Sequence, residues 1–335
     1  MKIRKIHALI LEVMLAQPYL ALLRTLIHNN PIQNMAKKPV KYYVVDAFTD
    51  SAFKGNPAAV CLLEDESDRD DTWLQAVAAE FNISETCYLT PIAEPDNNEN
   101  PNPRFSLRWF TPVAEVNLCG HATLAAAHTL FATGLVNSSI IEFETLSGIL
   151  TAKRVPQIKK ADALVQNGEE KEIFLIELDF PTVTTTEFNA VEVASISEAL
   201  NGASIIDIRR TTTTDDLFIV LPSGNSVIEL QPEFDKIEKF PGRGLIVSAV
   251  APPDSGFDFL SRFFCPKYGI NEDPVCGSAH CALAPYWSKK LGKSDFVAFQ
   301  ASPRGGTLNI HLDEQNHRVL LRGKAVTVME GSLLV

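Results

Sequence analysis

The chain has 335 residues, of which 46% are hydrophobic and 21% are charged, a composition typical of a soluble globular protein with a sizeable core. Its formal net charge of -11 argues against nucleic acid or an anionic membrane as a partner, because phosphate binding needs clustered Lys and Arg. Six cysteines are spread along the chain without a C-x-x-C pair, which indicates reduced thiols and not a disulfide framework.

The first 34 residues differ from the rest of the chain. They combine a basic start with an apolar stretch that Glu12 and Pro18 interrupt, whereas a membrane-spanning helix needs roughly 20 consecutive apolar residues. Because the folded pattern starts abruptly after "MAKKPVKYY", we expect residues 1–38 to be a dispensable N-terminal extension. We expect a cytoplasmic protein without a membrane partner. An organellar transit segment is the alternative for residues 1–34.

From residue 41 onward, strand-like and helix-like segments alternate. Runs of β-branched and aromatic residues predict strands at 41–48, 58–63, 85–90, 104–111, 139–145 and 148–155. A helical period predicts a helix at 71–82 with Asp71 as its N-cap, and an alanine-rich helix at 119–134 that Gly134 ends. The polar stretch that follows the last of these strands is the best domain boundary, which gives domains 39–158 and 159–335.

Two segments of the chain repeat one plan. The segments that begin at Phe110 and Phe264 both start Phe-x-Pro and both reach Cys-Gly-x-Ala, as "CGHA" and "CGSA". Each then enters an alanine-rich helix that a glycine closes. A single repeat over so long a period predicts two similar domains and not a solenoid, whose repeats span roughly 20 to 50 residues.

The start of each repeated helix has the chemistry of an anion site. Free backbone N–H groups and the positive end of the helix dipole bind carboxylates, and glycine lets a ligand approach the backbone closely. If a pseudo-twofold axis relates the two copies, both helix starts converge on one cleft. The sequence thus predicts a small-molecule carboxylate as the ligand.

The chain from about residue 43 to its end resembles the phenazine-biosynthesis isomerase-like (PhzF-like) family of the diaminopimelate epimerase superfamily. The matching segments, in order, are "VDAFTDSAFKGNPAAV", "AAEFNISETCYL", "LRWFTPVAEVNLCGHAT" and "GINEDPVCGSAH". The resemblance implies an α+β fold of two similar domains related by pseudo-twofold symmetry, each a curved mixed sheet around a central helix. It also implies acid/base chemistry without a cofactor, a homodimer, and a last strand that crosses back to the first domain.

By the same resemblance, Glu85 corresponds to the proton-transferring carboxylate, and His121 and Asp273 correspond to the other polar site residues. Gly120, Gly277 and Ser278 match positions that hold the substrate. A carboxylate that acts as a general base at neutral pH benefits from a raised pKa, which a dry cleft provides.

Two alternatives stay open. In the related epimerases two cysteines flank the substrate carbon, and Cys119 and Cys276 occupy that local position here, where helix N-termini lower thiol pKa values. The other alternative is a non-catalytic small-molecule-binding or interaction protein. A metal site at Cys276, His280 and Cys281 is disfavoured, because a helix places Cys281 on a different side from the other two. No motif calls for NAD, flavin or pyridoxal phosphate.

Overall fold

The computed structural model describes residues 38–65, 69–93, 102–156, 174–188 and 193–334, and Val40–Leu333 form one compact unit. Eighteen strands of this part of the chain belong to one hydrogen-bonded sheet. The first nine strands in chain order are β1 Val40–Ala47, β2 Asn56–Leu62, β3 Glu85–Pro91, β4 Arg104–Phe110, β5 Glu115–Val116, β6 Ile140–Thr145, β7 Gly148–Pro156, β8 Phe174–Pro181 and β9 Thr185–Glu187. The other nine are β10 Asp207–Thr211, β11 Leu217–Val220, β12 Leu245–Val250, β13 Phe259–Cys265, β14 Ile270–Asp273, β15 Asp295–Gln300, β16 Gly306–Asp313, β17 Arg318–Gly323 and β18 Ala325–Leu333.

The helices are few and mostly short. They are α2 Asp71–Phe81, α3 Gly120–Ala132, α4 Val193–Ala199, α5 Gly224–Ile228, α6 Phe234–Ile237 and α7 Gly277–Leu291, with the 3₁₀ turn η3 at Pro266–Tyr268. Strands and helices are thus mixed without regular alternation, and the fold class is α+β, as predicted.

The strand pairings confirm the internal repeat. In the first half, β2 runs parallel to β3, β3 antiparallel to β4, β4 parallel to β6, and β6 antiparallel to β7. In the second half, the same four relations link β11 to β12, β12 to β13, β13 to β15, and β15 to β16. Helix α3 joins β5 to β6, and α7 joins β14 to β15, so the repeated helices occupy equivalent places in the two halves.

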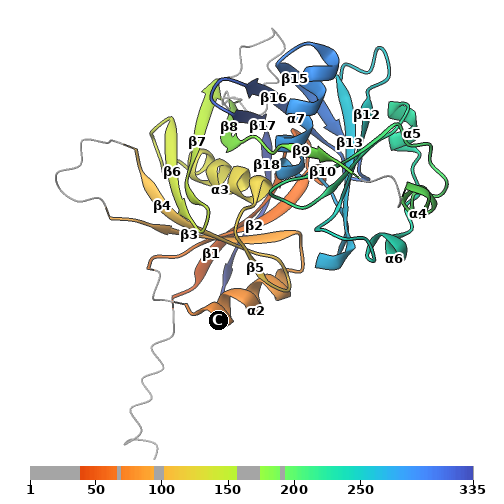
Figure 1. Cartoon of the computed structure of the whole chain (residues 1–335). Helices are drawn as coiled ribbons and strands as arrows, with labels where there is room; N and C mark the ends of the chain where they lie inside the picture. The colour runs from red at the N-terminus through yellow and green to blue at the C-terminus, as the bar shows by residue number, and fades with distance from the viewer. Residues whose placement is uncertain (1–37, 66–68, 94–101, 157–173, 189–192, 335) are drawn as a thin grey trace, which may run out of the picture. The chain divides into compact units, whose positions relative to one another are not determined.

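Helix α3 is a central helix of the first half. Eleven of its 13 residues are buried, as expected of a helix that is apolar on all sides. It contacts β1, β2, β3, β7, β8 and β18, and Figure 1 shows it among these strands. Its small alanine side chains let the curved sheet approach closely. Helix α7 plays the same part in the second half and packs on β16 and β17.

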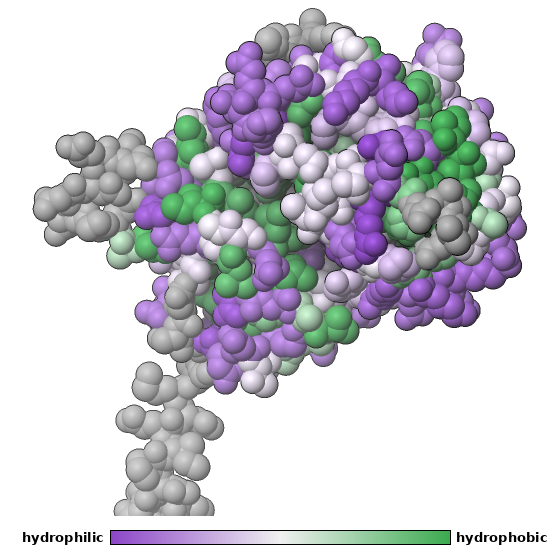
Figure 2. Space-filling model, viewed as in Figure 1, coloured by the Kyte–Doolittle hydropathy of each residue, from purple (hydrophilic) through white to green (hydrophobic). Residues whose placement is uncertain are grey.

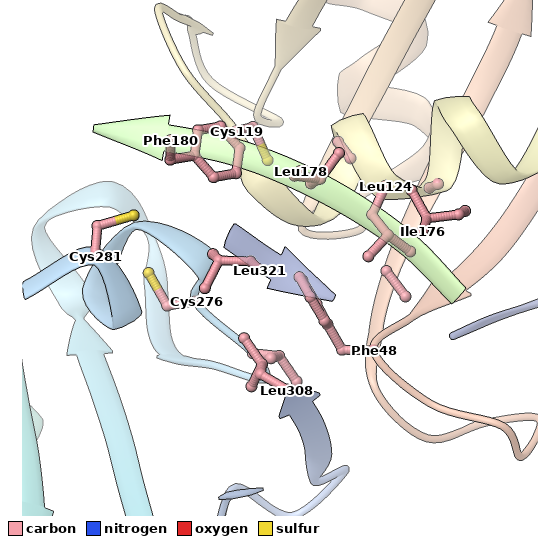
Figure 3. Close-up of a cluster of buried hydrophobic side chains, with 14 of the residues drawn as sticks. Phe48, Cys119, Leu124, Ile176, Leu178, Phe180, Cys276, Cys281, Leu308 and Leu321 are labelled. Carbon is pink, nitrogen blue, oxygen red and sulfur yellow. The ribbon is translucent and has the colours of Figure 1, made fainter. Parts of the chain in front are cut away.

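Two strands connect the halves. β8 pairs with β7 on one side and with β17 on the other, while β18 lies antiparallel beside β1. Side chains of β8 and β17, among them Phe180 and Leu321, lie in one buried cluster with Cys119 and Cys276 (Figure 3). The same hydrophobic core therefore extends under both repeated helices.

The ends of α2 and α3 can be compared with the predicted helix boundaries. The N-cap of α2 is Asp70 and not Asp71, because the Asp70 side chain accepts a hydrogen bond from the backbone N–H of Trp73 at 2.9 Å. Gly134 follows the end of α3 with a φ of +71°, the left-handed conformation expected of a glycine that ends a helix. The predicted N-terminal extension and the boundary near residue 158 fall on residues 1–37 and 157–173, outside the described residues, and stay predictions.

On the face shown in Figure 2, hydrophobic residues lie in groups among hydrophilic ones. Within the described ranges, no helix combines the length and the apolar character that a bilayer crossing demands.

Candidate active site

The two repeated helices begin at the same place in the molecule. A Cβ atom built on Gly120 would lie 3.4 Å from Cα of Gly277, and one built on Gly277 would lie 3.4 Å from Cα of Gly120. The first turns of α3 and α7 therefore approach backbone to backbone, which only small residues permit. Their N-terminal amides lie next to one cavity.

A cavity of about 470 Å³ opens at these helix starts. All eight site residues predicted from the sequence line it, namely Glu85, Cys119, Gly120, His121, Asp273, Cys276, Gly277 and Ser278. The wall also includes residues from four further segments, namely Thr111, Glu115 and Asn117; Thr213 and Thr214; Arg243; and Phe263, Tyr268 and Ile270. The volume suits a small metabolite.

Glu85 is a buried acid at the start of β3, only 7% exposed. Burial raises its pKa well above the ordinary value, and the neighbouring charge of Asp273 raises it further, while a hydrogen bond with Cys119 opposes the shift. Its Oε2 atom has no hydrogen-bond partner among the described residues. An unpaired carboxyl oxygen beside a cavity is available to a ligand, because nothing in the described protein competes for it.

Asp273 ends β14 and lines the same cavity as Glu85, from the second half of the chain. Burial raises the pKa of Asp273 to about 6, although hydrogen bonds from Cys276 and Asn56 and the charge of Arg243 lower it. Asn56 Nδ2 donates to Asp273 Oδ1 at 2.5 Å and to the carbonyl of Val275 at 3.0 Å. An amide on β2 thus fixes the orientation of a carboxylate 217 positions away.

Gln300 holds the backbone around Asp273. Its Nε2 donates to the Asp273 carbonyl at 2.6 Å, and its Oε1 accepts from the Cys276 N–H at 2.9 Å. The side chain is fully buried and bridges the two ends of the turn that enters α7. Asp273 therefore lies on a braced segment and not on a free loop.

His121 is buried in the first turn of α3, where burial lowers its pKa to about 3. Its Nδ1 lies 3.3 Å from Cys119 Sγ, and its Nε2 has no hydrogen-bond partner in the described part of the chain. A hydrogen bond with the Pro57 backbone opposes this shift of the pKa, and the imidazole is neutral at physiological pH.

The two thiols at the helix starts are not activated in this state. Burial raises the pKa of Cys276 to about 12, and burial with the nearby Glu85 raises that of Cys119 well above its ordinary value. The helix dipole, which favours a thiolate, is thus outweighed by desolvation.

Four polar residues that support this site were not identified from the sequence. They are Asn56, Asp216, Arg243 and Gln300. Arg243 lies between two glycines in "FPGRG", and this pattern was the one sequence feature that could have indicated its place at the site. Within the described ranges, no three His, Cys, Asp or Glu side chains are grouped as a metal site requires.

Solved structures define the class of the fold. A hydroxyproline epimerase from Agrobacterium vitis aligns with a TM-score of 0.55, over 89% of this chain and 93% of that chain, at 11% sequence identity. A probable proline racemase from Agrobacterium radiobacter aligns with a TM-score of 0.51, also at 11% identity. The fold is therefore of the diaminopimelate-epimerase type, with two similar halves.

The chain belongs to the PhzF-like family: the family model described as "Phenazine biosynthesis-like protein" matches residues 45–331. An uncharacterized isomerase of Halalkalibacterium halodurans is 45% identical over 294 residues, which cover 88% of this chain and 98% of the relative. A human phenazine biosynthesis-like domain-containing protein is 40% identical over 303 residues, with 87% and 98% covered. A crystal structure of a PhzF family protein from Enterococcus faecalis aligns with a TM-score of 0.72 at 37% identity, over 88% of this chain and 99% of that one.

Membership of this family supports an isomerase or epimerase type of enzyme.

Proposed function

We propose that the protein is a cofactor-independent isomerase that moves a proton between positions of a small carboxylate-bearing metabolite, with Glu85 as the general acid/base. The observation that carries this proposal is the environment of Glu85. Its carboxyl group is buried, has one oxygen without a described partner, and lines the cavity where the two helix starts meet.

The raised pKa of Glu85 suits a proton shuttle. A carboxylate in a dry site takes a proton from carbon more readily than one in water, and it keeps that proton until it is returned elsewhere. Asp273 contributes to the shift, since its negative charge disfavours a second charge on Glu85.

The substrate carboxylate is held by the helix starts in this proposal. The amides of Gly120 and Gly277 and the hydroxyl of Ser278 line the cavity, and helices of 13 and 15 residues add the positive ends of their dipoles. His121 and Asp273 orient the polar substituents of the substrate. Neutral His121 does so without adding a charge.

A two-thiol epimerase is the second candidate. Cys119 and Cys276 precede the two adjoining glycines, line the cavity, and so face it from both halves of the chain. Replacing Cys276 by Ser separates the candidates: the thiol mechanism loses proton exchange, whereas the Glu85 mechanism keeps it. Alkylation that the substrate blocks is a second signature of the thiol mechanism.

Label incorporation from solvent tests whether the protein is an enzyme. The purified protein is incubated with a metabolite extract in deuterated water, and mass spectrometry identifies compounds that gain deuterium at carbon. We expect a carboxylate-bearing compound to gain label above a protein-free control. If no compound gains label, the non-catalytic binding protein is the better account. The homodimer implied by the family resemblance and the cytoplasmic location expected from the sequence stay predictions.

A further inference from the structure

The loop Gly242-Arg243-Gly244 has no part in the proton transfer described above, yet close backbone contacts fix its conformation. Gly242 has a φ of +93°, and a Cβ there would lie 2.1 Å from the carbonyl oxygen of Asp215. A Cβ on Gly244 would lie 2.7 Å from the carbonyl oxygen of Phe264. Both glycines are thus required by close backbone contacts, and they hold the arginine between them at the cavity wall.

Further bonds fix this loop. The N–H of Arg243 donates to the Asp215 carbonyl at 2.7 Å, and the Gly244 carbonyl accepts from the Leu217 N–H at 2.9 Å. Lys267 Nζ donates to the Gly242 carbonyl at 2.9 Å. The position of Arg243 is therefore determined by its backbone and not only by its side chain.

The guanidinium of Arg243 joins a fully buried acid to the start of α7. Its Nε and Nη2 donate to the two carboxylate oxygens of Asp216 at 2.8 and 2.7 Å. Its Nη1 and Nη2 both donate to Ser278 Oγ at 3.2 Å, and the group lies 5.0 Å from the centre of the Phe263 ring. Asp216 has no exposed surface, so its charge is available only to Arg243 and its immediate surroundings.

These contacts determine what the Ser278 hydroxyl can do. A serine oxygen accepts two hydrogen bonds and donates one. Since two N–H groups of Arg243 occupy both acceptor positions, the O–H of Ser278 is left to donate, either to Cys276 Sγ at 3.3 Å or to a ligand in the cavity. The contacts also use four of the five N–H groups of the guanidinium, and no described residue accepts the fifth, on Nη1.

We propose that Arg243 is a positioning residue that makes the α7 side of the cavity selective for anions by committing the Ser278 hydroxyl to donation. This inference rests on the proposed function in one respect, since it concerns the charge of the ligand held at the same site. It does not depend on the proton-transfer step, because selection of an anion is a property of binding.

A matched pair of probes tests the selection without a known substrate. Benzoate and benzamide share one shape and differ in charge at neutral pH, and each is titrated calorimetrically into the full-length protein. We expect the wild type to bind benzoate about tenfold more tightly than benzamide, since hydrogen bonds to a charged acceptor are the stronger ones. Ser278→Ala and Arg243→Gln are each expected to reduce that ratio about threefold, because the helix-start amides keep part of the preference. Arg243→Lys is expected to restore part of the ratio.

The ratio separates selection from structural damage. Loss of structure weakens both probes together and leaves their ratio unchanged. Arg262→Gln is the control. Like Arg243, Arg262 forms a buried ion pair, with Glu272 at 2.7 Å, and lies over an aromatic ring, that of Phe264. Unlike Arg243, it does not line the cavity. We expect it to keep the wild-type ratio. If Arg243→Gln does not fold, Ser278→Ala and Arg243→Lys still decide the question.

Three results would overturn the proposal. The first is that the wild type binds benzoate no better than benzamide, or binds neither. The second is that Ser278→Ala keeps the wild-type ratio of benzoate to benzamide affinity, and the third is that Arg262→Gln lowers this ratio as much as Arg243→Gln does. Glu85→Gln tests the proton transfer separately. If that variant keeps solvent exchange while the benzoate ratio behaves as expected, the proposed function fails and the anion selection stands.

Discussion

Gly120 and Gly277 contact each other across the pseudo-twofold axis. In place of either glycine, any other residue would put its Cβ atom 3.4 Å from the α-carbon of the other glycine. This contact brings together two helix starts that are far apart in the sequence. It also brings Glu85 of the first half beside Asp273 of the second half.

Substitutions at Gly120 measure how tight this contact is. A methyl group at 3.4 Å from Gly277 Cα and 3.7 Å from Phe180 is an ordinary contact, so Gly120→Ala is expected to change the free energy of unfolding by less than about 1 kcal/mol. Gly120→Val adds atoms beyond that distance and is expected to cost about 1 to 3 kcal/mol. Urea denaturation measures both. A valine variant as stable as the wild type would show that the helix starts are not in close contact.

Asn56 is expected to stabilise the site by its two hydrogen bonds. Asn56→Ala leaves Asp273 Oδ1 and the Val275 carbonyl without this donor, which is expected to cost about 1 to 3 kcal/mol of unfolding free energy. Asn102→Ala is the control, because Asn102 makes one longer bond, 3.3 Å, to Glu142. Equal losses in the two variants would contradict a special role for Asn56.

The raised pKa of Asp273 predicts a dependence of stability on pH. Its folded-state value of about 6 lies above the ordinary value of 3.8, so the folded form binds the proton more tightly than the unfolded form. This contribution to stability is fully present below pH 3.8 and is lost as the pH rises through about 6. The unfolding free energy of the wild type, compared with that of Asp273→Asn, is expected to fall by about 2 kcal/mol between pH 4 and pH 7. A difference that does not vary with pH would contradict the shift.

Thiol alkylation tests the resting state of Cys276. With a pKa of about 12, its thiolate fraction at pH 8 is small, and iodoacetamide is expected to modify it roughly a thousandfold more slowly than free cysteine. The rate should still be rising at pH 10. Peptide mass spectrometry follows the reaction, and the urea-unfolded protein serves as the fast-reacting control. A rate that levels off near neutral pH would instead favour the two-thiol mechanism.

The sequence predicted the parts of this site that have local or repeated patterns. The recurrence of Cys-Gly-x-Ala before an alanine-rich run predicted two equivalent helix starts, and the structure confirms that Gly120 and Gly277 meet. The run of β-branched and aromatic residues at 85–90 predicted the strand that begins at Glu85. These signals are readable because a helix or strand imposes a short period on its own residues.

The supporting residues could not be predicted in the same way, because their partners lie far away in the sequence. Asn56 bonds to Asp273 across 217 positions, and Arg243 bonds to Ser278 across 35. Nothing near Asn56 or Gln300 distinguishes a buried amide from a turn residue. The lowered thiol pKa was expected from the helix start alone, whereas burial, which depends on the whole fold, acts in the opposite direction and is larger.

The central claim is that Glu85 carries the proton, and solvent exchange in Glu85→Gln tests it most directly. The compound identified from the metabolite extract is supplied in deuterated water, and its binding is measured in the same sample. We expect Glu85→Gln to bind the compound but to incorporate no deuterium at carbon, while Glu115→Gln, which lines the same cavity and pairs with Arg108 at 2.7 Å, keeps exchange. Full exchange in Glu85→Gln would contradict the account.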